Sequence, residues 1–343
     1  MLEGVEARTE VEIITWNLQR ASMWTGRQQR IREFAATCLE KQWDILLLTE
    51  ITAESTGSFW IGDGRHAVVV IHSTSAAVML CRGWAHRWKA DGERCWLSGR
   101  VAAVAVANLR LVACYHPSFR HNTREQMAAC RQLVEEQFTR ARAEKQWLIV
   151  GGDFNMSAGR LTDDMRNEGL SAAHGGHGFG ETNEAGRNFL RWCIELEAHW
   201  SNSFYQHGRR GTWWNQNQRQ WHELDGFITR ASQRTRWIKD IRVIQDDSFS
   251  DHRPVRATVR LHGLSTRKPD RVKWEALRLP EVAEQYAEAT SHLSAGWTES
   301  TSWTEVNAGL QPAYVESNSD LWKNPGCWDT NEKPGSSAAS WQS

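Results

Sequence analysis

The sequence predicts an α/β fold, a layered domain over residues 1–262 in which strands are covered by helices. Short runs rich in Val and Ile alternate with segments whose apolar residues recur every three or four positions, as expected for buried strands and amphipathic helices. The chain has 343 residues, enough at roughly 100–200 residues per domain for two domains or for one large domain with an extension. No repeat of fixed period interrupts this order.

The strands are expected where β-branched and aliphatic residues cluster in short runs between turn residues. These runs occupy residues 11–16, 45–49, 67–71, 77–80, 100–106, 109–115, 147–150, 225–229, 241–244 and 255–259. Three longer segments carry the helical period instead, at residues 27–41, 123–143 and 185–196. In the first of them Ile31, Phe34 and Cys38 lie on one face, and in the second Cys130 and Val134 do the same.

The composition excludes a membrane protein and a small disulfide-stapled scaffold. Apolar runs such as residues 101–107 are far shorter than the ~18 residues of a membrane span. The acidic start of the chain lacks the basic and apolar regions of a secretory signal, so we expect an intracellular, soluble protein with no membrane partner. Seven widely spaced cysteines without a Cys-x-x-Cys pair predict buried free thiols and argue against a structural zinc site.

The composition changes near residue 262. Five of the seven prolines lie beyond that point, and the last residues are rich in Ser. We expect residues 263–343 to form a linker with short helices at 274–279 and 280–293 and a disordered tail. Residues 261–343 hold 7 basic and 11 acidic side chains, which leaves a net charge of +4 on residues 1–260, a mildly basic balance that suits a polyanionic partner.

Polar residues stand where the expected strands end or begin. Side chains at strand ends project from a rigid scaffold into loops, where catalytic sites are usually built. The sequence therefore supplies a set of candidates expected to converge on one edge, namely Asn17, Glu50, Tyr115, Asp153, Asn155, Asp225, Asp251 and His252.

These candidates offer oxygen atoms, apart from one histidine. Sparse carboxylate and amide oxygens suit Mg²⁺, whereas Zn²⁺ would require more His or Cys. We therefore expect a Mg²⁺ cofactor, for which Mn²⁺ can substitute. Mg²⁺ beside a histidine points most simply to phosphate-ester chemistry.

Each candidate taken alone also has a structural interpretation. Asn17 can cap the turn before the helix at residue 27, and Tyr115 can be a partly buried aromatic residue with a satisfied hydroxyl. Asp251 can bond the backbone of its own turn. Only the joint pattern favours catalysis.

The ordered series resembles the endonuclease/exonuclease/phosphatase superfamily over residues 10–261. The motifs that carry the resemblance are Trp16-Asn17, Glu50, Tyr115-x-Pro117, Gly152-Asp153-Phe154-Asn155, Asp225 and Ser250-Asp251-His252. Any one of them occurs by chance in many chains, whereas six in this order at strand ends are specific. The resemblance implies a layered α/β sandwich, with two mixed β-sheets packed face to face and helices outside.

The resemblance also implies roles for the residues around the metal and the water. Asn17 and Glu50 would help to hold Mg²⁺, with Asp251 near the metal. Asp153 would activate or orient the attacking water, and Asn155 would position it.

The remaining motif residues would act on the phosphate. His252 would contact the scissile phosphate and pair with Asp225, whose carboxylate fixes the imidazole and favours its protonated form. Tyr115 would donate a hydrogen bond to the same phosphate. Such a site counters the developing charge of a phosphodiester with a cation and hydrogen-bond donors.

Two positions depart from the pattern of many relatives. A basic residue often stands two positions before the Asp225 equivalent and an aromatic residue just after it, and here Glu223 and Gly226 occupy those places. The difference affects expected substrate contacts more than the chemistry.

Accessory residues suggest a nucleic-acid substrate. Arg209, Arg210, Trp213 and Trp214 interleave cations with aromatic rings, as a nucleic-acid surface does, and residues 230–239 show a similar pattern. The alternative is a pair of solvated loops whose Trp rings belong to the core.

The segment after the domain resembles the connector that follows the endonuclease of non-LTR (LINE-type) retrotransposons. There a basic linker leads to a short helix, which here corresponds to residues 267–286. We therefore expect a DNA endonuclease that nicks one strand and leaves a 3′ hydroxyl, with DNA as substrate, no obligate protein partner and a plausible place in the nucleus. The alternatives are an apurinic-site repair endonuclease or phosphatase, or a decayed copy that binds nucleic acid without cutting.

Overall fold

The computed structural model describes residues 10–19, 28–62, 66–118, 123–206, 208, 211–246 and 249–261. All of them lie in one compact unit, Met1–Leu264. The expected connector and tail, residues 263–343, lie outside the described residues. No helix in the described ranges is long and apolar enough to cross a membrane.

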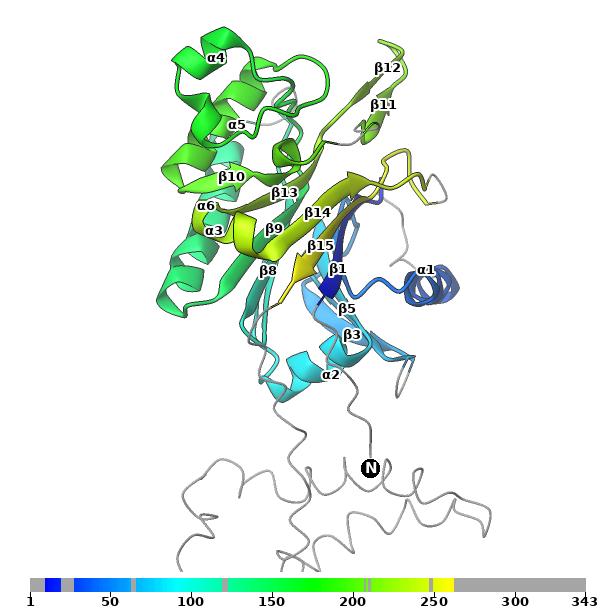
Figure 1. The fold of residues 1–343 in the computed structure, drawn as a ribbon. Helices are drawn as coiled ribbons and strands as arrows, with labels where there is room; N and C mark the ends of the chain where they lie inside the picture. Colours follow the sequence, from blue (N-terminus) through cyan, green and yellow to red (C-terminus); the bar gives the residue numbers. More distant parts are fainter. Residues whose placement is uncertain are drawn as a thin grey trace, which may run out of the picture. The chain divides into compact units, whose positions relative to one another are not determined.

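Two large mixed sheets form the body of the protein (Figure 1). The seven-stranded sheet has the order β14-β15-β1-β2-β5-β4-β3, in which β1 and β2 are parallel. Its strands are β1 (Glu10–Asn17), β2 (Ile45–Thr49), β3 (Gly57–Ile61), β4 (Val68–His72), β5 (Ala76–Cys81), β14 (Ile238–Val243) and β15 (Val255–Arg260).

The six-stranded sheet has the order β10-β13-β9-β8-β7-β6, in which β8 and β9 are parallel. Its strands are β6 (Cys95–Ser98), β7 (Val101–Val106), β8 (Leu109–Tyr115), β9 (Trp147–Asp153), β10 (Ala198–Trp200) and β13 (Asp225–Arg230). A separate hairpin of β11 (Trp213–Asn215) and β12 (Gln220–His222) projects beyond one end of the sandwich (Figure 1).

The helices cover the outer faces of the sandwich. In Figure 1, α3 and α5 lie against the six-stranded sheet, and α1 lies on the side of the seven-stranded sheet. The helices are α1 (Gln28–Glu40), α2 (Gly83–Ala90), α3 (Arg124–Ala143), α4 (Asp163–Asn167), α5 (Glu184–Glu195) and α6 (Ala231–Trp237), with short 3₁₀ turns at Leu170–Ala172 and Ser201–Phe204. The expected α/β sandwich is confirmed.

Strand periodicity divides the core into three layers. Successive side chains of a strand point to opposite faces, so Ile13 packs between the sheets while Ile14 and Trp16 pack under α1. On β9, Ile149 faces the space between the sheets and Val150 faces α3 and α5. Because both faces are covered, these strands are almost continuously apolar, which is the pattern that the sequence displayed.

Within the described residues, the sequence predicted ten of the fifteen strands and three of the six helices. It missed β3, β6, β10, β11 and β12, which are three to five residues long and only partly apolar, and the short or highly polar helices α2, α4 and α6. Six cysteines are free in the described chain, five of them buried, as expected.

Strand β9 extends beyond its predicted end, and the extension positions the site. The sequence predicted a strand over residues 147–150, whereas pairing continues through Gly151 and Gly152 to Asp153. A Cβ on Gly152 would lie 1.9 Å from the carbonyl oxygen of Cys114, so only glycine allows β8 to come this close. Asp153 therefore sits within the sheet, level with Tyr115 on β8 and Asp225 on β13.

Candidate active site

Strand register brings the predicted residues to one edge of the sandwich. Asn17 ends β1, Tyr115 ends β8 and Asp153 ends β9, while Asp225 begins the antiparallel strand β13. Parallel strands end at the same edge, and an antiparallel neighbour begins there, so the convergence follows from the topology. His252 joins them from the segment before β15.

Asp153 is buried at the centre of this edge. Its Oδ2 accepts a hydrogen bond from Asn17 Nδ2 at 2.8 Å, and its Oδ1 accepts one from the backbone N–H of Asn155, also at 2.8 Å. Burial and then the nearby Asp225 carboxylate raise the pKa of Asp153 to about 7, against the lowering effects of His252 and these hydrogen bonds. The carboxyl can thus gain or lose a proton near neutral pH, which a general base requires.

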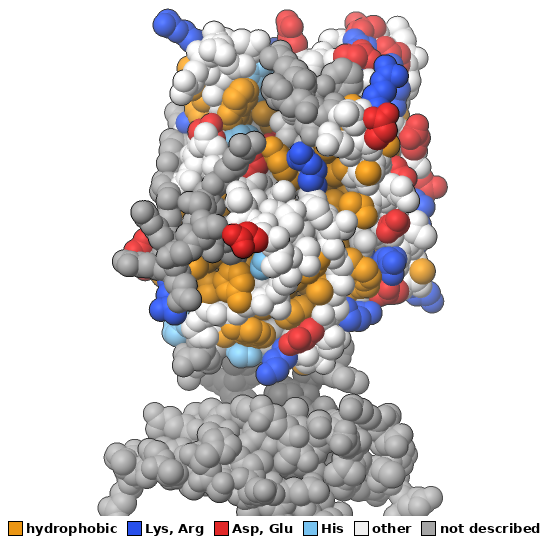
Figure 2. All heavy atoms as spheres, turned by 180° about the vertical axis from the view of Figure 1, so that it is seen from behind, with side chains coloured by type: hydrophobic (Ala, Val, Ile, Leu, Met, Phe, Trp, Pro, Cys, Tyr) orange, Lys and Arg blue, Asp and Glu red, His pale blue; other side chains and the backbone are white. Residues whose placement is uncertain are grey.

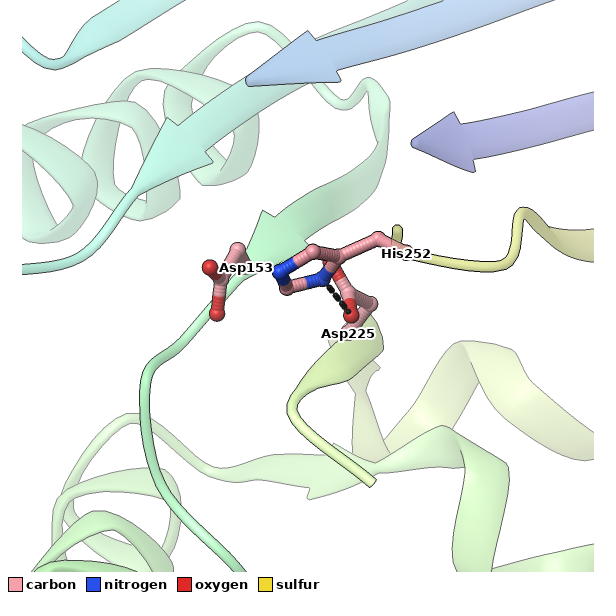
Figure 3. A group of neighbouring side chains, drawn as sticks. All are labelled: Asp153, Asp225 and His252. Atoms are coloured by element: carbon pink, nitrogen blue, oxygen red, sulfur yellow. Dashed lines mark hydrogen bonds and ion pairs between the residues drawn. The ribbon is translucent and has the colours of Figure 1, made fainter. Parts of the chain in front are cut away.

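His252 and Asp225 form a buried pair. His252 Nδ1 lies 2.8 Å from Asp225 Oδ2, and Figure 3 shows the imidazole between the carboxylates of Asp225 and Asp153. Burial lowers the pKa of His252, but the charge and hydrogen bond of Asp225 outweigh it and raise the pKa to about 9. The imidazole is therefore protonated at neutral pH and can donate from Nε2.

The backbone around His252 is held from two sides. The indole Nε1 of the buried Trp16 donates to the His252 carbonyl oxygen at 2.8 Å, and the His252 N–H donates to Ser250 Oγ at 3.0 Å. The Trp16 and Ser250 of the sequence motifs thus fix the position of the histidine.

The carboxylates of Asp153 and Asp225 are potential metal ligands, and they lie beside His252, whose imidazole could bind a metal only in its neutral form. One ligand atom from each lies within 4.8 Å of the others. The wider donor set suits a hard divalent cation, because carboxylate and amide oxygens predominate and Asp225 Oδ1 is buried without a hydrogen-bond partner among the described residues.

The expected ligands Asn17, Glu50 and Asp251 surround this group. Asn17 contacts Asp153 directly, and its Oδ1 accepts from the backbone N–H of Gln19 at 2.8 Å. Glu50 follows β2 with a left-handed backbone (φ 52°). Asp251 is exposed, and its Oδ1 lies 4.0 Å from His252 Nε2. Their role as metal ligands stays a prediction.

Tyr115 donates its phenolic hydrogen to Glu50 Oε1 at 2.7 Å. Burial, together with the Glu50 carboxylate, raises the pKa of Tyr115 well above its usual range, so the hydroxyl remains a donor. In this structure the donor faces a carboxylate, and its expected contact with a phosphate stays a prediction.

Asn155 connects the site to the next loop. It has a left-handed backbone (φ 50°), and its Nδ2 donates to the carbonyl oxygen of His116 at 2.8 Å. His116 is itself buried, and burial, followed by the charge of Arg131, lowers its pKa to about 4.

One residue that the sequence did not reveal explains both departures at Glu223 and Gly226. Asn202 Nδ2 donates to Glu223 Oε1 and to the Asp225 carbonyl oxygen, each at 3.0 Å, and Asn202 Oδ1 accepts from the Phe227 N–H at 3.0 Å. A Cβ on Gly226 would lie 2.2 Å from the Asn202 amide. Glu223 accepts a hydrogen bond from Asn202, and Gly226 leaves room for its amide group. These three residues together hold the start of β13 in place. The position of Asn202 after β10 gives no sequence signal.

The predicted aromatic surface is divided between the two faces of the hairpin. Trp213 faces the site, where its Nε1 donates to Asp251 Oδ2 at 3.3 Å and its ring lies 6.2 Å from that of His252. Trp214 is 37% exposed and packs at 5.5 Å against Trp221, over which the Arg253 guanidinium lies at 3.6 Å.

The basic residues proposed for the same surface are placed differently. Arg209 and Arg210 lie outside the described residues. The run 230–239 begins at the end of β13 remote from Asp225, where Arg234 stacks on Phe204 at 3.7 Å, so it does not adjoin the site.

A protein-family model covers the part of the chain that contains all six motifs. The family model described as Endonuclease/Exonuclease/phosphatase family matches residues 14–252, more than half of the chain. The comparison with curated proteins found no match.

Solved structures with a similar fold include the following three. The catalytic domain of Xenopus laevis APE2 is 13% identical over 73% of this chain and 92% of its own, with a TM-score of 0.47. A 3′-5′ exonuclease from Neisseria meningitidis is 17% identical over 73% of this chain and 100% of its own (TM-score 0.46). The endonuclease domain of TRAS1, a telomere-specific non-LTR retrotransposon, is 17% identical over 74% of this chain and 99% of its own (TM-score 0.43).

Proposed function

Because the chain belongs to the endonuclease/exonuclease/phosphatase family, whose members hydrolyse phosphate esters, we propose that it is a DNA endonuclease of the retroelement type. It would nick one strand and leave a 3′ hydroxyl. The observation that carries the proposal is the buried group of Asp153, Asp225 and His252 at one sheet edge, directly below an aromatic hairpin.

The side chains divide the chemistry among them. Asp153, with its pKa near neutrality, takes a proton from the attacking water, and Asn155 beside it positions that water. His252, charged through its pair with Asp225, faces the charge that develops on the phosphate. Tyr115 adds a second donor.

A metal complements these groups. Asn17 and Glu50 would hold Mg²⁺, or Mn²⁺ in its place, with Asp251 nearby, and the ion when bound would offset negative charge on the phosphate. The carboxylates of the site would otherwise repel a polyanion, so the donor set itself argues for a cation.

The hairpin favours a nucleic-acid substrate over a small phosphate ester. Trp214 and Trp221 offer ring surface for bases, and Arg253 adds positive charge on the same face of the hairpin. On the face of the molecule in Figure 2, by contrast, basic and acidic side chains are interspersed. We therefore place DNA at the hairpin and the adjoining edge.

Nicking of supercoiled plasmid by the full chain tests the proposal. Wild type is expected to nick in Mg²⁺ and not in EDTA, and Asp153→Ala to lose activity by about 10³-fold, within the 10²–10⁴ of general-base catalysis. Asp163→Ala, an exposed acid on α4, serves as the matched control. Faster turnover of an inositol phosphate or sphingomyelin than of DNA would contradict the nuclease assignment, and binding without any cutting would favour a decayed copy.

A further inference from the structure

A cavity with arginines and an apolar floor adjoins the proposed active site. It has a volume of about 470 Å³ and lies between α3 and α5, with its inner wall formed by residues that follow β8 and β9. Among these are His116 and Asn155, the residue whose backbone N–H donates to Asp153. The volume falls within the range of small-molecule sites. The cavity thus meets the site at Asn155.

The cavity carries excess positive charge. Arg124, Arg131 and Arg191 line it together with one acid, Glu195. Arg191 pairs with Glu168 at 2.8 Å, a carboxylate that it shares with Arg187. Arg131 and Arg124 have no ion pair with a described residue, although the charges of Glu195 and Glu135 act on Arg131. Arg131 is half-buried, and its Nε has no hydrogen-bond partner there. Such an arginine offers a planar set of donors that matches a phosphate.

The floor of the cavity is apolar and rigid. Met127, Phe189 and Trp192 contribute to it, and the guanidinium of Arg131 lies 5.3 Å over the Trp192 ring. The indole is fixed because its Nε1 donates to Glu135 Oε1 at 2.8 Å. A flat aliphatic or aromatic group can pack there beside the cation.

His116 adds an unused acceptor. Its Nδ1 lies 3.0 Å from the Pro117 carbonyl oxygen, and because a carbonyl only accepts, Nδ1 carries the proton. Nε2 is then a bare acceptor, and it is buried without a partner among the described residues. A buried polar atom without a partner is costly, and a ligand with a donor can satisfy it.

We propose that this cavity binds the nucleotide next to the scissile phosphate, with its phosphate on Arg131 and its sugar or base against the floor. Cation, apolar surface and acceptor together match a nucleotide better than a simple anion. Asn155 contacts Asp153 and also lines the cavity, so the nucleotide next to a phosphate at Asp153 can reach the cavity mouth. The inference rests on the proposed function, because that function places the strand at Asp153.

Arg131→Gln tests the inference against Arg140→Gln, which removes the same charge from the same helix nine residues away. Binding of a short fluorescein-labelled DNA duplex is measured by anisotropy at several salt concentrations, in Ca²⁺ without Mg²⁺. Arg131→Gln is expected to weaken binding about tenfold and to reduce the slope of log Kd against log salt by about one, as loss of one phosphate contact does. Arg140→Gln should leave both unchanged.

A second variant and the plasmid assay make each outcome decisive. Arg124→Gln, at the exposed start of α3, should reduce the salt slope in the same direction even if Arg131→Gln fails to fold, which its thermal unfolding would reveal. Wild-type affinity and slope in a folded Arg131→Gln would overturn the cavity assignment. Absence of nicking by wild type would instead overturn the proposed function, so the two failures are distinguishable.

Discussion

The edge that carries the proposed active site and the hairpin lie side by side, yet they are built differently. At the edge, Asp153, Asp225 and His252 are buried, and strand pairing or hydrogen bonds fix each of them. The hairpin has strands of three residues, and its outer ring, Trp214, is exposed. Burial shifts pKa values and fixes geometry, whereas exposure leaves ring surface for a partner. The edge therefore suits chemistry and the hairpin suits recognition.

The largest expected effect comes from the buried pair at the edge. Asp225→Asn and His252→Gln should each lower the nicking rate about 10³-fold, because the charge on His252 depends on Asp225. The double variant should lose no more than either single one, since the two residues act as a unit. Rates from plasmid nicking, with Asp163→Asn as control, check this. Losses that multiply would show that the two residues act independently.

The next effect is a bell-shaped pH dependence of kcat/KM. Asp153 must lose its proton, so the rate should rise with pH up to the pKa of about 7. His252 must keep its proton, so the rate should fall as pH rises through about 9. Each arm should approach tenfold per pH unit well away from its pKa. Because half of Asp153 is still protonated at pH 7, the rate should fall about 50-fold between pH 7 and pH 5.

Asp225→Asn provides a stricter test of that pH profile. Asp225 raises the pKa values of both Asp153 and His252, so both arms should move to lower pH in the variant's residual activity. An alkaline arm that stayed in place would show that another group sets it.

Asn202 joins the two regions, since it bonds Glu223 at the end of the hairpin segment and Asp225 at the edge. Asn202→Ala would remove hydrogen bonds from the buried Glu223 carboxylate, the Asp225 carbonyl oxygen and the Phe227 N–H, at an expected cost of about 2–3 kcal/mol in the free energy of unfolding. Urea denaturation measures this, with the exposed Asn217→Ala as control. Equal stability of the two variants would contradict the role assigned to Asn202.

Asn202 also marks where prediction from sequence stops. The edge was predictable because strands ending in Asn17, Tyr115 and Asp153 combine a periodic signal with polar residues whose place follows from sheet topology. Asn202 acts through contacts with residues more than twenty positions away, which no local pattern records.

The hairpin and the cavity were harder to predict from the sequence, for the same physical reason. Strands of three residues carry no period, so Trp213 and Trp214 were recognised by composition and not by structure. The cavity brings together α3, α5 and two loops, and Arg131 reads in sequence as one more charge on a helix. Tertiary packing determines where the hairpin and the cavity form, and local sequence patterns do not record it.

The smallest effect is expected from Trp214 on the hairpin. Trp214→Ala should weaken binding of the fluorescein-labelled duplex about tenfold, within the 1–3 kcal/mol of one base stacked on an aromatic ring. Because the ring is exposed, the thermal unfolding midpoint should not change, and because the residue is uncharged, neither should the salt slope that Arg131→Gln alters. Trp60→Ala, an equally exposed ring on the edge strand β3, is the matched control. If both variants bound DNA as wild type does, recognition would have to lie at the edge itself, and the division between chemistry and recognition would fail.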